Sequence, residues 1–341
     1  MGLTRDKTSS SNSVEASPVF RVGIDENGLG ARLGPLVVTA VVAEVTRAGL
    51  RAIESGQSQS NQPLLGDSKR LIAHGNVRLG EAWARVLAGE NARHPAELLE
   101  AITAVPTTRL KQRCPSNASP QCWHDKKERF KAGDFLLTDV ERARHRLQKR
   151  GIKPVRVLSR LVCTSELNTR GEAGENRFLV DLHCMEELIL QISGSLKAPL
   201  NVVCGKVGSM RDYTRHFAHL NAKEPEALQE SPASSVYRLA SLGEVRFVRD
   251  ADATDPLVML ASLVGKYLRE LFVDRIGRHF APELTQLKQP SGYHDPVTAE
   301  FVEATAGLRN RINFPPSCFE RASLQPSGQV EICRGRTSRD T

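Results

Sequence analysis

Two adjacent carboxylates follow an apolar segment near the start of the chain. Asp25 and Glu26 come directly after the mostly apolar residues 19–24 and lead into the glycine-rich stretch 27–34. At the end of a strand, one backbone can hold two such side chains near a hard cation, which prefers oxygen ligands. Glycines allow close approach of the backbone and supply N–H donors for a ligand oxygen. The pattern indicates a cation-binding site, although a charged turn after an edge strand has the same sequence.

Four further segments extend this pattern along the chain. They are Gly34-Pro35-Leu36-Val37-Val38, the stretch 65–71 (Leu-Gly-Asp-Ser-Lys-Arg-Leu), Asp250-Ala251-Asp252 before Leu260-Ala261-Ser262-Leu263-Val264-Gly265-Lys266, and Gly292-Tyr293-His294 before Phe314-Pro315. With residues 22–30, they resemble the motifs of the ribonuclease HII (type 2 ribonuclease H) family: G-I-D-E-A-G-R-G, G-P, D-S-K-K-L, K-G-D before A-A-S-I-L-A-K, and a late G-Y. The resemblance spans residues 22 to about 320, and the spacing from Asp252 to Lys266 matches the family pattern.

The resemblance implies a fold and an activity. The fold is an α/β, ribonuclease H-like mixed five-stranded sheet flanked by helices, with insertions and a C-terminal helical region. The activity is hydrolysis of RNA in RNA–DNA hybrids, or at ribonucleotides embedded in DNA, with Mg²⁺ or Mn²⁺. Two cations about 4 Å apart activate a water and stabilise the leaving oxygen in such a reaction. Carried over to this chain, the metal-binding catalytic acids are Asp25, Glu26 and Asp252.

The same resemblance assigns substrate-binding residues. Gly28, Leu29 and Gly30 occupy the turn that reads the 2′-hydroxyl, the group that distinguishes RNA from DNA. Leu29 stands where the family has Arg, so the backbone part of the contact is kept and the side-chain part is lost. Lys69 lies in the substrate-facing D-S-K segment, and Tyr293 matches a tyrosine that stacks on a sugar. Surface charge and an ordinary loop residue are the alternative interpretations of these two.

One acid of the family is missing. Its V-D-G-N setting corresponds to residues 202–206 (Val-Val-Cys-Gly-Lys), which puts Cys204 at the acid's position and Lys206 nearby. A thiol is mostly neutral at pH 7, and sulfur is a poor ligand for Mg²⁺. We expect the strand ends near 24, 204 and 250 to converge with their side chains facing one cleft, and Cys204→Asp to strengthen the use of Mg²⁺. Three further acids are either substitutes for the missing ligand or solvated surface groups: Asp212, Asp250 and Asp255.

Two functions of different classes are open. The first is a divergent ribonuclease HII-like endonuclease that cleaves by two-metal catalysis, which the retained Asp25, Glu26 and Asp252 favour. The second is a catalytically impaired, nucleic-acid-binding relative, which Cys204 and Leu29 favour. Both predict an RNA–DNA hybrid or ribonucleotide-containing duplex DNA as the partner.

The composition agrees with a polyanionic partner but does not require one. The chain has 341 residues, 40% hydrophobic and 25% charged, with a net charge of +8. Its seven cysteines are odd in number and irregularly spaced, and in a cytosolic chain we expect them to be reduced thiols. No apolar run approaches the roughly 18 residues of a membrane span, and residues 1–18 lack the apolar core of a secretory signal. We expect a cytoplasmic protein and favour a monomer.

Hydrophobic periodicity predicts the order of the elements. The predicted strands are 19–24, 36–45, 155–163, 200–204 and 244–248. The predicted helices are 78–90, 96–103, 135–150, 176–193 and 257–274, and 219–232 is predicted as a loop. One domain, 19–322, would contain an insertion or helical subregion at 91–154, between a disordered tail at 1–18 and a disordered basic tail at 323–341.

Overall fold

The computed structural model describes residues 19–56, 64–66, 71, 75–89, 92–125, 128–283 and 287–322. The tails predicted at 1–18 and 323–341 lie outside the described residues, and so does Lys69. None of the helices in the described ranges has the length and apolar character needed to cross a membrane.

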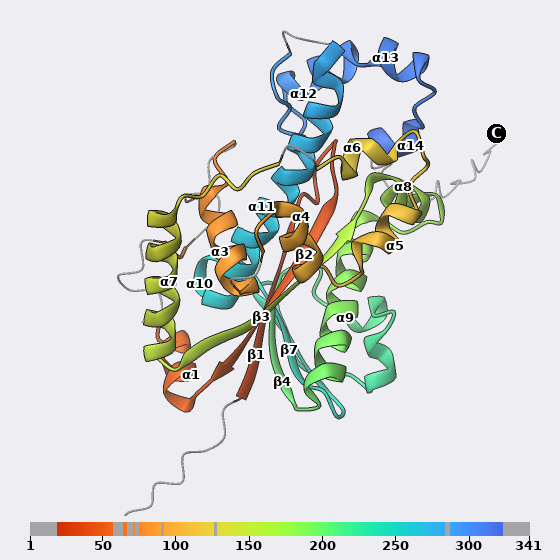
Figure 1. The fold of residues 1–341 in the computed structure, drawn as a ribbon. Helices are drawn as coiled ribbons and strands as arrows, with labels where there is room; N and C mark the ends of the chain where they lie inside the picture. Colours follow the sequence, from red (N-terminus) through yellow and green to blue (C-terminus); the bar gives the residue numbers. More distant parts are fainter. Residues whose placement is uncertain are drawn as a thin grey trace, which may run out of the picture.

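A seven-stranded mixed sheet runs through the centre of the molecule in the order β3-β2-β1-β4-β7-β6-β5 (Figure 1). Its strands are β1 (Val19–Asn27), β2 (Leu36–Val45), β3 (Ile152–Val162), β4 (Leu200–Gly205), β5 (Glu226–Glu230), β6 (Ser234–Leu239) and β7 (Gly243–Val248). β1 pairs antiparallel with β2 and parallel with β4, which in turn pairs parallel with β7. The predicted class, a mixed sheet flanked by helices, is confirmed, whereas the predicted number of five strands is wrong.

The two additional strands, β5 and β6, continue the sheet beyond β7 through antiparallel pairing. The sequence prediction placed a loop at 219–232, which includes β5. All five residues of this strand are exposed, and its sequence, EALQE, has no alternation of buried apolar side chains. Backbone pairing with β6 forms the strand, and a pattern based on hydrophobicity contains no signal for such an edge.

Helices cover both faces of the sheet (Figure 1). They are α1 (Arg47–Glu54), α3 (Arg78–Ala88), α4 (Pro95–Ile102), α5 (Thr107–Gln112), α6 (Ser119–Trp123), α7 (Asp134–Lys149), α8 (Thr164–Glu172), α9 (Arg177–Leu196), α10 (Ala251–Thr254), α11 (Pro256–Phe280), α12 (Pro296–Ala304), α13 (Ala306–Arg311) and α14 (Pro316–Phe319), with the short 3₁₀ helices η1 (Thr214–His216), η2 (Leu220–Lys223) and η3 (Ala281–Glu283). α11, α3, α4 and α7 share one core with side chains of β2 and β3. α9 covers the opposite face, where its side chains join those of β1, β4 and β7.

The region 91–154 contributes to the main core. α4, α5, α6 and α7 lie within it. Leu98, Leu110, Val140 and Leu147 are buried in the same core as the apolar side chains of α11. These helices therefore help to bury the face of the sheet on which α11 packs.

The central strand β1 is shaped to receive α11. Side chains alternate along a strand, so Val22 and Ile24 point into the core under α9, while Gly23 faces α11. A Cβ at Gly23 would lie 2.4 Å from the backbone of Leu257. The absence of a side chain at Gly23 lets α11 pack directly against the strand that carries Asp25.

The C-terminal helices form a smaller aromatic core at one end of the molecule. Phe280, Phe301, Phe314 and Phe319 are buried together with Leu33, which belongs to the turn between β1 and β2. Edge-to-face contacts connect these rings, for example between Phe280 and Phe319, with centroids 5.5 Å apart. The aromatic core thus fixes the C-terminal region against the turn that follows β1.

Candidate active site

Three central strands end side by side at one edge of the sheet. Ile24 pairs with Cys204, and Cys204 pairs with Phe247, in parallel ladders. Asp25 is the next residue of β1, and β7 leads within a few residues into α10, which carries Asp252. The predicted convergence of these strand ends is confirmed.

A cavity of about 390 Å³ lies at this edge. Seven of the residues assigned from the sequence line it: Asp25, Glu26, Gly28, Leu29, Gly30, Asp252 and Tyr293. Lys266 of α11 lines it as well. Lys69 lies outside the described residues, and Cys204 is not among the residues that line the cavity.

Cys204 and Gly205 face opposite sides of the sheet. Cys204 is fully buried in the core under α9, and this burial raises the pKa of its thiol well above the usual range. Gly205 lines the cavity, and a Cβ there would lie 3.0 Å from Oδ1 of Asp25 and 3.6 Å from Oε2 of Glu26. This geometry corrects the expectation that Cys204 faces the cavity, because Gly205 and not Cys204 lines it.

The junction that carries Asp252 is tightly held. Asp250 adopts φ 54° and ψ 32°, a left-handed conformation that is uncommon outside glycine. Asp255 then caps α11 by accepting hydrogen bonds from the backbone N–H groups of Leu257 (2.8 Å) and Val258 (3.2 Å). The short α10 is therefore fixed between β7 and α11.

The three acids considered as substitutes for a missing ligand have different surroundings. Asp250 lines the cavity. Asp255 is 4% exposed and forms an ion pair with Arg21 at 2.7 Å. Asp212 accepts a hydrogen bond from the Thr214 hydroxyl at 2.6 Å, and this bond lowers the pKa of Asp212. Of the three, Asp250 alone lines the cavity.

A buried arginine holds the glycine turn in place. Arg321 donates to the carbonyl oxygen of Gly28 at 2.5 Å and to that of Gly34 at 2.9 and 2.8 Å. Burial, with repulsion from Arg177 and Arg269, lowers the pKa of Arg321 to about 9. Gly28 has φ +89°, and a Cβ on it would lie 2.9 Å from Cδ of Arg269. The turn at Gly28 therefore requires glycine both for its backbone conformation and for space.

Tyr293 presents an exposed aromatic ring at the cavity. Its side chain is 43% exposed, and the guanidinium carbon of Arg269 lies 4.0 Å from the ring centroid. Arg269 is itself fixed by a hydrogen bond of 2.8 Å to the carbonyl oxygen of Ser291. A ring supported on one face and open to solvent is suited to stacking on a sugar or a base.

Positive charge also lines the cavity. Lys206, Arg249 and Lys266 lie along its wall beside the carboxylates. Nζ of Lys206 donates to the carbonyl oxygen of Ser231 (3.0 Å) and to Oγ of Ser235 (3.2 Å), so its charge is directed toward β6. Burial and nearby arginines lower the pKa of Lys206. A positive charge beside the carboxylates would oppose a bound cation, and these contacts hold the ammonium group of Lys206 on the side of β6.

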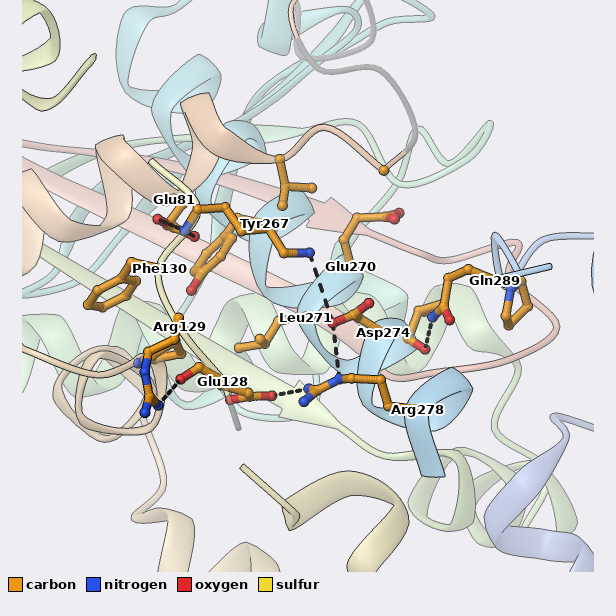
Figure 2. Close-up of a pocket in the computed structure, with 16 residues that line it drawn as sticks. Glu81, Glu128, Arg129, Phe130, Tyr267, Glu270, Leu271, Asp274, Arg278 and Gln289 are labelled. Atoms are coloured by element: carbon orange, nitrogen blue, oxygen red, sulfur yellow. Dashed lines mark hydrogen bonds and ion pairs between the residues drawn. The ribbon is translucent and has the colours of Figure 1, made fainter. Parts of the chain in front are cut away.

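A second cavity, of about 410 Å³, lies between α3, α11 and the segment 128–131 (Figure 2). Its carboxylates are already paired. Glu128 accepts hydrogen bonds from Arg275 and Arg278 at 2.5–2.7 Å, and Glu81 accepts from the backbone N–H of Lys131 at 2.9 Å. The acids of the second cavity are thus used in internal ion pairs and hydrogen bonds, which indicates a role in holding the fold together.

The carboxylates at the strand ends provide the type of ligand atom that a divalent cation prefers. Asp25, Glu26 and Asp252 offer oxygen atoms, the donors that Mg²⁺ and Mn²⁺ prefer. Within the described part of the chain, no three His, Cys, Asp or Glu side chains form a ready-made metal-binding group. The residues therefore match the chemistry of a divalent ion, and binding would have to draw their side chains closer together.

One further acid lies close to this set. Asp181 of α9 is fully buried, and in the described structure neither of its carboxylate oxygens has a hydrogen-bond partner. Burial, and then the charges of Glu26 and Asp25, raise the pKa of Asp181 well above its usual range. A carboxyl buried without a partner is costly, and a cation at the neighbouring acids would offset that cost. This orphaned group supports the fit of the site to a divalent ion.

Three residues of this region belong to none of the motifs found in the sequence: Asp181, Arg249 and Arg321. One signal was available. Asp181 stands four residues before Met185, on the buried side of α9, where a charged residue interrupts an apolar pattern. No comparable pattern marks Arg321, whose partners lie 287 and 293 positions earlier in the chain.

The fold and the site define an α/β protein with carboxylates gathered at the ends of parallel central strands. Solved structures that this chain resembles include ribonucleases HII and HIII. Ribonuclease HII from Archaeoglobus fulgidus, in its complex with PCNA, is 16% identical, with 92% of this chain and 98% of that chain covered and a TM-score of 0.44.

Two other structures give similar values. Bst-RNase HIII in complex with Mn²⁺ is 10% identical, with 89% of this chain and 67% of that chain covered and a TM-score of 0.40. Ribonuclease H2 from Pyrococcus horikoshii OT3 is 16% identical, with coverages of 88% and 92% and a TM-score of 0.39. No protein-family model and no curated protein matches the chain. Because each TM-score is below 0.5, the case for function rests on the residues of this chain.

Proposed function

We propose that this protein is a metal-dependent endonuclease that hydrolyses RNA in RNA–DNA hybrids or at ribonucleotides embedded in duplex DNA. The observation that carries the proposal is the shared cavity of Asp25, Glu26 and Asp252. The motif series that resembles ribonuclease HII comes from segments far apart in the chain, and its acids, glycine turn and tyrosine all border this cavity. Such a gathering is expected for a site of phosphodiester hydrolysis and is not required by packing.

In this function, the carboxylates of Asp25, Glu26 and Asp252 would hold Mg²⁺ or Mn²⁺. When bound, a divalent ion lowers the pKa of its water and stabilises negative charge on the phosphate and the leaving oxygen. Lys266 and Arg249 place positive charge on the same wall, where it would attract the phosphates of the substrate.

The remaining residues of the cavity would position the substrate. The turn at Gly28 and Gly30 would bring its backbone to the 2′-hydroxyl that identifies a ribonucleotide. Tyr293, held by Arg269, would stack on the neighbouring sugar or base. The side chain of Leu29 contributes no polar group to this recognition. We therefore expect a weaker preference for ribonucleotides than a hydrogen-bond-donating side chain at position 29 would give.

The proposal is tested by cleavage of an end-labelled duplex that contains one ribonucleotide, with Mg²⁺ and Mn²⁺ in parallel. Asp25→Asn should reduce the rate by about 10²-fold or more, because a group that stabilises charge in the transition state is lost. Asp139→Asn is the matched control, since Asp139 is an exposed residue of α7. Equal cleavage by the Asp25→Asn variant would contradict the proposal.

A second candidate is a nucleic-acid-binding relative without catalysis. Gly205 favours it, because the position that faces Asp25 and Glu26 from β4 carries no carboxylate. This candidate predicts no cleavage by the natural protein with either metal, together with hybrid binding that Asp25→Asn leaves intact. The same assay, paired with a binding measurement, separates the two functions.

A further inference from the structure

Gly205 of β4 faces Asp25 and Glu26 but has no side chain. On the neighbouring helix α9, Asp181 has no hydrogen-bond partner in the described structure. We propose that Asp181 of α9 is the third acid of the site and joins Asp25 and Glu26 in binding a divalent cation. The inference rests on the proposed function, because it names an additional ligand of the same site.

The orientation of β1 and β4 shows why the acid can come from α9. Glu26 follows Ile24 by two residues and so alternates onto the face of the sheet that α9 covers. Asp181 is buried on that same face, four residues before Met185, which belongs to the core under α9. The carboxyl of Asp181 therefore approaches the acids from the helix, whereas a carboxylate at Gly205 would approach from the strand.

The surroundings of Asp181 argue against a purely structural role. α9 contains a second fully buried acid, Glu186, and its carboxylate accepts hydrogen bonds from the backbone N–H groups of Ala218 (3.1 Å), His219 (2.6 Å) and Leu220 (2.7 Å). Glu186 thus fixes a turn, as a structural acid does. Asp181 has no such bonds in the described structure. A bound cation would give its two oxygens the partner that the fold does not supply.

The charge balance points the same way. Burial and the charges of Glu26 and Asp25 act on Asp181, and both Asp181 and Asp25 act on the thiol of Cys204. Asp181 thus lies close enough to Glu26 and Asp25 for their charges to act on it. A divalent cation is the ligand that relieves such repulsion, because it neutralises two charges and accepts oxygen donors.

The test measures binding of Mn²⁺ alone to the full chain, by calorimetry and by the rise in Tm that the ion produces. Asp181→Asn, which keeps the shape and removes the charge, should weaken Mn²⁺ binding at least about tenfold, since even residues that only support a metal ligand cost 10- to 100-fold. It should also abolish most of the Mn²⁺-induced rise in Tm, because that rise depends on the ratio of metal concentration to Kd.

Glu186→Gln is the matched control on the same helix. It should lower the Tm of the metal-free protein, because three backbone N–H groups lose a charged acceptor, and it should keep both the Mn²⁺ affinity and the metal-induced rise. Should Asp181→Asn not fold, Asp181→Ala serves as the second variant, because it leaves no polar atom to bury.

The outcomes are distinct from those of the cleavage assay. Wild-type Mn²⁺ affinity in both Asp181 variants would overturn the inference, even if the protein cleaves hybrids. Loss of Mn²⁺ binding in the Asp181 variants without cleavage by the natural protein would support the ligand and contradict the nuclease. Failure of the natural protein to bind millimolar Mn²⁺ would contradict both.

Discussion

Asp25 is the first group that a side chain at position 205 would meet. Gly205→Asp would place its Cβ 3.0 Å from Oδ1 of Asp25, so its carboxylate would repel the existing acids until a cation binds. We expect this variant to lower the Tm without metal and to tighten Mn²⁺ binding about tenfold or more. Calorimetry and thermal unfolding with and without Mn²⁺ measure the two effects.

The neighbouring substitution provides the contrast. Cys204→Asp would bury a carboxylate in the core under α9, so it should destabilise the protein by about 3–5 kcal/mol, the usual cost of an uncompensated buried charge. Contrary to the expectation from the sequence, any gain in Mn²⁺ affinity should be smaller than that of Gly205→Asp, because Gly205 and not Cys204 lines the cavity. If Cys204→Asp raised the Mn²⁺ affinity and Gly205→Asp did not, the position of the missing acid would be Cys204 and not Gly205.

The sequence located this region but not the orientation of its residues. Residues 202–206 contain one apolar run followed by glycine and lysine, and both Cys204 and Gly205 lie beside the end of that run. Alternation reverses the face with each residue, and six residues of β4 do not reveal which face meets the acids. The pairing of Ile24 with Cys204, and the 3.0 Å that would separate a Cβ at Gly205 from Oδ1 of Asp25, settle the orientation.

Tyr293 allows a separate test of substrate binding. Tyr293→Ala should weaken association with an RNA–DNA hybrid by about 1–3 kcal/mol, the usual contribution of stacking on an aromatic ring. Tyr293→Phe keeps the ring over Arg269 and should bind as the natural protein does. Fluorescence anisotropy with a labelled hybrid measures both variants, and unchanged binding of the Ala variant would remove Tyr293 from the substrate site.

At the scale of elements, α11 is held to β1 by a buried ion pair. Arg21 donates to Asp255 at 2.7 Å, with side-chain exposures of 9% and 6%, and Asp255 also caps α11. Asp255→Ala should reduce the free energy of unfolding by about 3–5 kcal/mol, because the buried charge of Arg21 would lose its anionic partner and keep only the neutral Asn201. Urea denaturation measures this loss.

The control for this prediction is an exposed pair. Asp139→Ala removes the contact between Asp139 and Arg142, whose side chains are 55% and 68% exposed, and should cost less than about 1 kcal/mol. Similar losses in Asp139→Ala and Asp255→Ala would mean that the ion pair at β1 does not anchor α11.

The elements that the sequence predicted are those that bury much apolar surface. β2 is a nearly continuous run of buried β-branched and small residues, and α11 is buried along most of its 25 residues; both were predicted. β5 is exposed throughout and was missed. Hydrophobic patterns report burial, so strands that exist through backbone pairing at the edge of a sheet escape them.

At the scale of the whole molecule, the site is assembled from distant segments. Residues near 25, 205, 252 and 293 meet at one cavity, and the family resemblance pointed to all four segments, the one near 205 through its missing acid. Arg321 acts through contacts across the fold, which no local pattern encodes. The cytoplasmic location and monomeric state expected from the sequence stay predictions.

Hybrid binding by this basic chain should depend strongly on salt. The net charge is +8, and each phosphate that a cationic side chain neutralises lowers the slope of log affinity against log salt by about 0.9 on duplex DNA. Arg249 lines the cavity. Arg249→Gln should therefore make the slope shallower by about one contact, while Arg142→Gln, on the exposed side of α7, should leave it unchanged.

Anisotropy titrations of the hybrid at several salt concentrations measure these slopes. In the same titrations without metal, the Asp25→Asn variant should bind the hybrid at least as tightly as the natural protein. The reason is that the substitution removes a negative charge from the cavity wall that carries Arg249. A flat dependence on salt in the natural protein, or equal slopes for Arg249→Gln and Arg142→Gln, would mean that phosphates do not approach this cavity. Both candidate functions require that approach, so that result would exclude them together.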